Sequence, residues 1–104
     1  MGILTYNSTR TLELDDRLLA HLRAVMFAKL RRGESFSFSW EQTPVQGSGR
    51  NSVWIGPDTP LTFQLFESRD IPLNGEWLRR LTKAANSPAG LVALPEVEND
   101  APQG

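Results

Sequence analysis

The side chains of this sequence that could take part in catalysis or binding are one histidine, a series of serines and a set of arginines. His21 lies in an apolar stretch with no nucleophile or second ligand at a useful spacing, so we interpret it as a partly buried surface residue. The serines of S-F-S-F-S-W (35–40) alternate with aromatic residues and lack the G-x-S-x-G motif of a nucleophile elbow, which indicates the polar side of a strand. Neither group predicts a catalytic residue.

The absence of cysteine narrows the chemistry further. Without Cys the chain can form no disulfide, no thiolate nucleophile and no Cys-ligated zinc site, and a single His excludes the usual histidine-rich metal sites. The acids Glu41, Asp58, Glu67 and Asp70 show no spacing that implies shared general acid–base work. We therefore expect no metal, no cofactor and no enzymatic activity.

Two further features favour a structural interpretation over a functional one. The loop Q-G-S-G-R (46–50) is rich in glycine, but it lacks the phosphate-binding patterns G-x-x-x-x-G-K-[ST] and G-x-G-x-x-G and joins two expected strands. We interpret it as a hairpin loop. Lys29 falls inside the apolar stripe of an expected helix. Because burial of an ammonium group is costly, we expect its side chain to extend past the helix end or to pair with an acid.

The basic residues gather in three places, which raises the alternative of nucleic-acid binding. These places are Arg31 and Arg32 with Lys29, then Arg50, and finally Arg79, Arg80 and Lys83. Cations neutralise phosphates, and aromatic residues such as Trp54 and Phe66 stack on bases. Three of the twelve acids lie after residue 94, so residues 1–94 hold eleven basic and nine acidic side chains, an excess of about +2. Sequence-independent nucleic-acid binders usually have a far larger surplus.

Trp54 and Phe66 have a second interpretation. We expect both to lie on the serine side of the sheet, where small neighbours let a second protein surface approach and aromatic residues anchor interfaces. The start M-G-I-L-T-Y-N-S lacks the basic and apolar regions of a secretory signal. The sequence therefore favours a non-enzymatic cytoplasmic interaction module that associates with itself or with a protein partner and not with a membrane. Nucleic-acid binding through the arginine clusters is the alternative.

The apolar pattern changes its period at Gly33 and so predicts the elements that position these residues. Before Gly33, apolar residues recur about every 3.6 residues, which predicts a helix over 16–32 with Asp15 or Asp16 as its cap. After Gly33, the alternation of 35–40 predicts a strand whose aromatic face is turned inward, with Phe38 fully buried. A helix followed at once by a half-buried strand is the clearest structural signal in the chain.

The remaining elements follow from the same patterns. Runs 3–6, 11–14, 51–55, 61–67 and 90–94 predict strands, and 75–85 predicts a helix capped by Asn74. The order β-β-α-β-β-β-α-β predicts one α+β domain over residues 1–95, in which a mostly antiparallel sheet packs one face on two helices. Residues 96–104 are acidic and nearly without apolar side chains, which predicts a disordered tail.

Three runs also carry a resemblance to a known family. They are residues 15–40, the later S-V-W-I-G-P-D-T-P-L-T-F (52–63) and A-N-S-P-A-G-L (85–91). Together they resemble a small, uncharacterised actinobacterial family that commonly carries the label "ATP-dependent DNA ligase", and the resemblance covers residues 2–95. Such ligases need a lysine nucleophile in K-x-D-G, whereas Lys29 is followed by L-R-R and Lys83 by A-A-N. The resemblance therefore implies no ligase residue here, and at most a nucleic-acid context.

Overall fold

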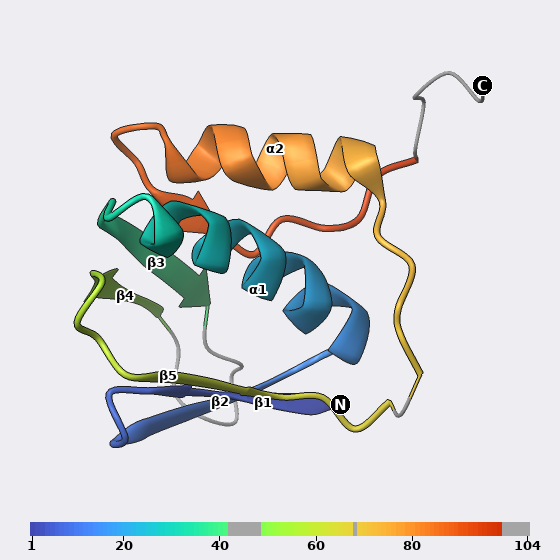
Figure 1. Ribbon diagram of the computed structural model, residues 1–104, viewed down its shortest axis with the longest axis horizontal. Helices are drawn as coiled ribbons and strands as arrows, with labels where there is room; N and C mark the ends of the chain where they lie inside the picture. The colour runs from blue at the N-terminus through green and yellow to red at the C-terminus, as the bar shows by residue number, and fades with distance from the viewer. Residues whose placement is uncertain (42–48, 68, 99–104) are drawn as a thin grey trace.

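The helices and strands of the structure follow one another in the predicted order (Figure 1). The computed structural model describes residues 1–41, 49–67 and 69–98. Its elements are β1 (Gly2–Tyr6), β2 (Arg10–Leu14), α1 (Asp16–Arg31), β3 (Phe36–Glu41), β4 (Arg50–Ile55), β5 (Leu61–Gln64), α2 (Gly75–Ala85) and β6 (Leu91–Val92). The α+β class, the mostly antiparallel pairing and the order β-β-α-β-β-β-α-β are therefore confirmed.

The strands divide between two three-stranded sheets, where the sequence suggested one. The first sheet has the order β2-β1-β5 and the second the order β4-β3-β6. All pairs are antiparallel except β3 with β6. The division arises after β4, where the Thr59 N–H donates to the Gly56 carbonyl at 3.0 Å and turns the chain out of the second sheet. β5 then pairs with β1 instead of β4.

Side chains of the first hairpin join the two sheets. The Tyr6 hydroxyl donates to the Trp54 carbonyl at 3.0 Å, and Arg10 donates to the side-chain oxygen of Asn51 at 3.0 Å. The Arg10 guanidinium also lies over the Trp40 ring, 5.5 Å from its centroid, which is a favourable cation–π distance. These contacts place the turn of the first hairpin beside β4.

The two helices lie side by side and run in the same direction (Figure 1). His21 of α1 contacts Asn74 at the start of α2, and Lys29 near the end of α1 contacts Asn86 at the end of α2. Both helices also contribute buried apolar side chains to the hydrophobic core, and these include Leu19, Leu22, Met26, Trp77 and Leu81. Polar contacts therefore fix the helix pair at both ends of an apolar interface.

The helix ends form as the sequence predicts. The Asp15 side chain accepts from the backbone N–H groups of Arg17 and Leu18, and the Asn74 side chain accepts from the N–H of Trp77. Gly33 has φ = +73°, a conformation that glycine adopts without the strain of a Cβ. α1 ends at Arg31, one residue earlier than predicted.

The aromatic face of β3 is turned into the core. Phe38 and Phe36 are buried and Trp40 is partly buried, stacked on Phe38 with the ring centroids 5.6 Å apart. Ser39 on the other side is buried as well, and its hydroxyl pairs with that of Ser52 at 2.7 Å. The predicted burial of Phe38 is confirmed, and the serine pair satisfies two hydroxyl groups across the β3–β4 ladder.

Candidate functional site

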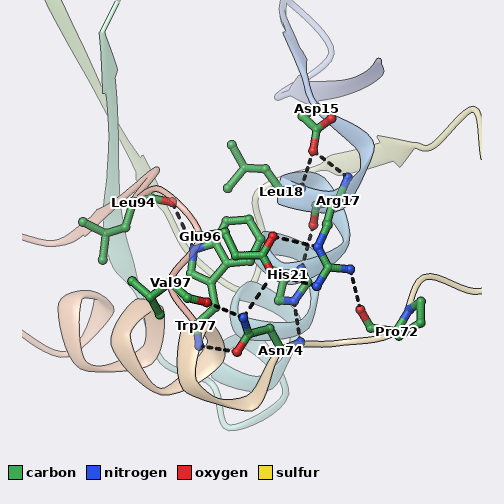
Figure 2. Close-up of polar contacts among 10 residues, drawn as sticks. All are labelled: Asp15, Arg17, Leu18, His21, Pro72, Asn74, Trp77, Leu94, Glu96 and Val97. Atoms are coloured by element: carbon green, nitrogen blue, oxygen red, sulfur yellow. Dashed lines mark hydrogen bonds and ion pairs between the residues drawn. The ribbon is translucent and has the colours of Figure 1, made fainter. Parts of the chain in front are cut away.

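Four polar side chains join the two helices to the C-terminal segment, and we call this group the polar clasp (Figure 2). Its members are Arg17, His21, Asn74 and Glu96. Arg17 donates to both carboxylate oxygens of Glu96, at 2.8 and 2.7 Å, and the Asn74 side-chain amide donates to the same carboxylate at 3.0 Å. Arg17 also donates to the Pro72 carbonyl at 3.0 Å. The polar clasp thus connects three segments that lie far apart in the sequence.

Glu96 is held in its charged form by this geometry. The hydrogen bond from Arg17, followed by that from Asn74, lowers the pKa of Glu96 to about 2, and the same ion pair raises the pKa of Arg17. Such a paired, two-point contact is the strongest form of an arginine–carboxylate interaction. The carboxylate therefore stays ionised at any ordinary pH.

The position of Glu96 changes the expected boundary of the domain. We expected a disordered tail from residue 96, yet Glu96 binds Arg17, and the Val97 carbonyl accepts from the Asn74 side chain at 2.6 Å. Val97, the single branched aliphatic residue of the tail, is partly buried against the core as well. The composition of the tail does not indicate these contacts, because the polar ones are made by one charged group and one backbone carbonyl. Residues 99–104 of the predicted tail lie outside the described residues.

His21 is buried with an exposed fraction of 0%, which corrects its interpretation as a partly buried surface residue. Its Nδ1 lies 2.7 Å from the Arg17 carbonyl oxygen, and its Nε2 accepts from the Asn74 backbone N–H at 2.8 Å. Because Nε2 accepts, the ring is neutral with its proton on Nδ1. Burial lowers the pKa of His21, and the ring packs on Trp77 with the centroids 4.3 Å apart. Both ring nitrogens are engaged: Nδ1 contacts a carbonyl of α1 itself, and Nε2 joins α1 to the start of α2.

A second polar group joins the C-terminal ends of the helices. The Lys29 ammonium lies 3.1 Å from Glu34 and also donates to the Asn86 side-chain oxygen. The predicted pairing of Lys29 with an acid is confirmed. Its positive charge sits where both helices present the negative ends of their dipoles, which favours a cation at this position.

Trp54 stands at the edge of a hollow beside these helix ends, which we call the helix-end groove. Its wall includes Lys29, Glu34, Ser35, Ser37, Asn86 and Pro88. Trp54 lies opposite Ser37 in the β3–β4 ladder and is 65% exposed. The groove thus combines one large exposed aromatic ring with a mostly polar wall.

Phe66 lies far from Trp54, although the sequence placed both on one face. Phe66 follows β5 and is 56% exposed, and its backbone N–H donates to the Asp16 carboxylate at 3.0 Å. Asp16 begins α1, whereas Lys29 of the helix-end groove lies near its other end. At 1.5 Å per residue the sixteen-residue helix is about 24 Å long. The two aromatic residues therefore cannot anchor a single small contact.

The arginine clusters do not merge into one basic surface. Arg79 and Arg80 both pair with Glu76, and Arg32 pairs with Glu34 at 3.3 Å. Lys83 shares the side of α2 that carries Arg79 and Arg80. Arg50 lies opposite Glu41 at one end of the β3–β4 strand pair. The other end of this pair, at Phe36, is the end that follows α1, so Arg50 lies away from the end of α1. Several of the predicted binding cations are thus already neutralised or separated.

A second hollow, which sequence analysis missed, lies between α1 and residues 63–67 and 69–73, and we call it the α1 groove. It has a volume of about 580 Å³, and its apolar lining includes Ala24, Phe27, Phe63 and Leu73. Phe27 and Leu73 are 38% and 49% exposed. The signal available in the sequence was Phe27 itself, which lies off the apolar stripe of the helix and therefore needs a contact outside it. In the structure its ring meets Phe63 edge-on at 5.3 Å.

A family model described as "Domain of unknown function (DUF7882)" matches residues 1–96. The chain belongs to the DUF7882 family. No curated protein and no solved structure matches the chain. The part that matches DUF7882 reaches Glu96 and therefore includes every residue of the polar clasp and of the α1 groove.

Two classes of site are missing from the part of this DUF7882 domain that the structure describes. Residues 1–41, 49–67 and 69–98 contain no group of three or more His, Cys, Asp or Glu side chains that could hold a metal ion. Within the same residues, neither helix is long and apolar enough to cross a membrane.

Proposed function

We propose that this protein is a non-enzymatic interaction module of the cytoplasm that associates with a second copy of itself or with a protein partner. One observation carries the proposal: Phe27 and Leu73, two exposed large apolar residues, share the α1 groove. Soluble proteins leave single apolar side chains exposed, but a grouped set beside charged residues is typical of an interface. Trp54 beside the helix-end groove adds a second exposed anchor.

The geometry of His21 supports a non-enzymatic role. A histidine base must bring an unoccupied ring nitrogen within about 3 Å of the proton that it removes. Both nitrogens of His21 are engaged, with the Arg17 carbonyl and the Asn74 N–H, and the ring is buried. The chain has no other histidine and no cysteine. An enzyme built on this domain would have to work with carboxylates, lysines or hydroxyl groups alone.

Nucleic-acid binding is the second candidate, supported by the exposed cations of α2, Arg79, Arg80 and Lys83. Two of these three share the carboxylate of Glu76, which leaves fewer charges to neutralise phosphates. Affinity for nucleic acid depends on the number of phosphate contacts, because each contact releases counterions. We rank this candidate below protein association for that reason.

Sedimentation equilibrium over a wide concentration range, at low and at high salt, tests the proposal. We expect the average mass to rise with concentration toward that of a dimer. A parallel titration of labelled single- and double-stranded DNA and RNA at low salt should show no binding in the range where the protein associates. A monomer at all concentrations together with tight, salt-sensitive binding to nucleic acid would reverse the order of the two candidates.

A further inference from the structure

One stripe of α1, buried at Ala20 and exposed at Phe27 and Arg31, has the spacing of a helix–helix contact. Ala20, Ala24, Phe27 and Arg31 follow one another at intervals of four, three and four residues and all line the α1 groove. Residues at these intervals lie above one another on one face of a helix. Ala24 is half-buried and small enough for a second helix to approach closely, and Phe27 offers a ring to cover. This face points away from the core face of the same helix, which carries Leu19, Leu22 and Met26.

Charge is distributed unevenly along the α1 groove. Its basic end is at Arg31, in the last turn of α1. Its acidic end is formed by Glu67 and Asp70. The backbone N–H of Glu67 donates to Asp16 in the first turn of α1 at 2.6 Å. Asp70 lies two residues before Pro72, whose carbonyl accepts from Arg17. The groove therefore has opposite charges at its two ends, about the length of α1 apart.

Two more arginines complete the rim. Arg23 lies between the two ends, and Arg69 lies at the acidic end. The charges of Arg69, Glu67 and Asp70 add up to −1, so this end remains acidic. Within the described residues, none of the five charged side chains on this rim makes an ion pair, in contrast to Arg17, Arg32, Arg79 and Arg80. The five side chains are thus available for ion pairs with a partner.

We propose that the α1 groove binds a second copy of this chain, with the two α1 helices antiparallel about a twofold axis near Ala24 and Phe27. This inference rests on the proposed function and assigns its surface. A twofold axis makes each contact occur twice, so Arg31 of each copy faces Glu67 and Asp70 of the other. A parallel arrangement would bring like charges together. The antiparallel arrangement also opposes the two helix dipoles.

The chemistry of this contact determines its strength. Burial of Phe27 and Leu73 supplies the apolar part, and the exposed ion pairs at the ends contribute little each but fix the orientation. A stable interface covers about 800 Å² on each partner, roughly an eighth of the 6693 Å² surface. Because the ends are held by exposed charges, salt weakens the association, unlike a purely apolar contact.

Charge reversal with rescue tests the arrangement. Arg23→Glu with Arg31→Glu makes one side of the α1 groove acidic, and Glu67→Arg with Asp70→Arg makes the other basic, so each doubly substituted protein meets like charges in its own dimer. We expect each to associate at least tenfold more weakly than the unsubstituted protein by sedimentation equilibrium. An equimolar mixture restores every opposite pair in a heterodimer, so its association should recover. Thermal melting by circular dichroism checks that both variants fold.

Matched controls separate this inference from the proposed function. Lys83→Glu reverses an exposed charge on α2 and should leave association unchanged, and Trp54→Ser removes the exposed ring of the other groove and should do the same. If the charge-reversed proteins associate as tightly as the unsubstituted one, or if Trp54→Ser alone dissociates the dimer, the groove assignment is overturned while the proposed function stands. If the unsubstituted protein is monomeric throughout, the assignment and the self-association are both overturned.

Discussion

Replacing His21 with phenylalanine tests the polar clasp with little disturbance of packing. The phenyl ring can occupy the same place against Trp77, whose ring centroid lies 4.3 Å from that of His21. What the substitution removes is the acceptor at Nε2, which takes the Asn74 backbone N–H at 2.8 Å, and the contact of Nδ1 with the Arg17 carbonyl. His21→Phe therefore isolates the hydrogen bonds from the burial of the ring.

The expected loss of stability follows from the burial of Asn74, which donates to His21. Asn74 is buried, so water cannot replace the lost acceptor of its N–H. A buried donor without a partner costs about 1–3 kcal/mol. Out of a total stability of about 5–15 kcal/mol for a small domain, this is a large fraction. We expect His21→Phe to lower the free energy of unfolding by about 1–3 kcal/mol at neutral pH.

The loss should depend on pH in a defined direction. Burial lowers the pKa of His21 in the folded protein below its ordinary value of 6.5. The unfolded chain therefore binds more protons than the folded chain between the lowered pKa and about 6.5, so stability falls as pH falls through this window. The charged neighbours of His21 are Arg17 and Glu96, and Glu96, with its pKa of about 2, stays ionised there. The difference between the unsubstituted protein and His21→Phe should shrink as pH falls.

Urea unfolding at a series of pH values measures both effects. The midpoint and slope at each pH give the free energy of unfolding for the two proteins, and equal slopes confirm that only stability has changed. Equal stability of the two proteins at neutral pH would refute the role given to the Asn74 hydrogen bond. A difference that does not change between neutral pH and pH of about 5 would refute the burial of a neutral His21.

Three more substitutions test the core, the clasp and a turn. Phe38→Ala should lower the free energy of unfolding by about 3–5 kcal/mol in chemical denaturation, because the whole ring is buried, and an unchanged midpoint would contradict that burial. Glu96→Gln should lower the melting temperature, whereas Glu98→Gln, an exposed site, should not; equal values would mean that the Arg–Glu pair adds no stability. Gly90→Ala should lower the free energy of unfolding in chemical denaturation far more than Gly33→Ala. Both glycines have positive φ, but only at Gly90 would a Cβ overlap a serine hydroxyl.

The sequence predicts the local parts of this fold well. The change of apolar period at Gly33 and the caps Asp15 and Asn74 are read from neighbouring residues, and they place α1, β3 and α2 within a residue or two. The division into two sheets could not be read in this way. β5 pairs with β1 across more than fifty residues, and its alternating pattern would fit the edge of either sheet equally well.

The clasp and the grooves depend on contacts that local patterns do not contain. His21 and Asn74 are separated by 53 positions, and Arg17 and Glu96 by 79. A lone histidine and a lone glutamate carry no signal of such a partner. For the same reason Trp54 and Phe66 were assigned to one face by alternation, whereas the separation of β4 and β5 into different sheets places them apart. Phe27 was recognisable only as an aromatic residue that the core stripe did not accommodate.

The polar clasp and the α1 groove share a structural element. One wall of the groove is formed by residues 63–67 and 69–73, and none of these described residues lies in a helix or strand after Gln64. The start of that segment is held by Asp16, which accepts the N–H groups of Phe66 and Glu67, and its end by Arg17, which binds the Pro72 carbonyl. His21 then accepts from the backbone N–H of Asn74, two residues after Pro72. Since side chains of α1 hold both ends of its opposing wall, the groove is shaped by the same helix that would pack against a second copy.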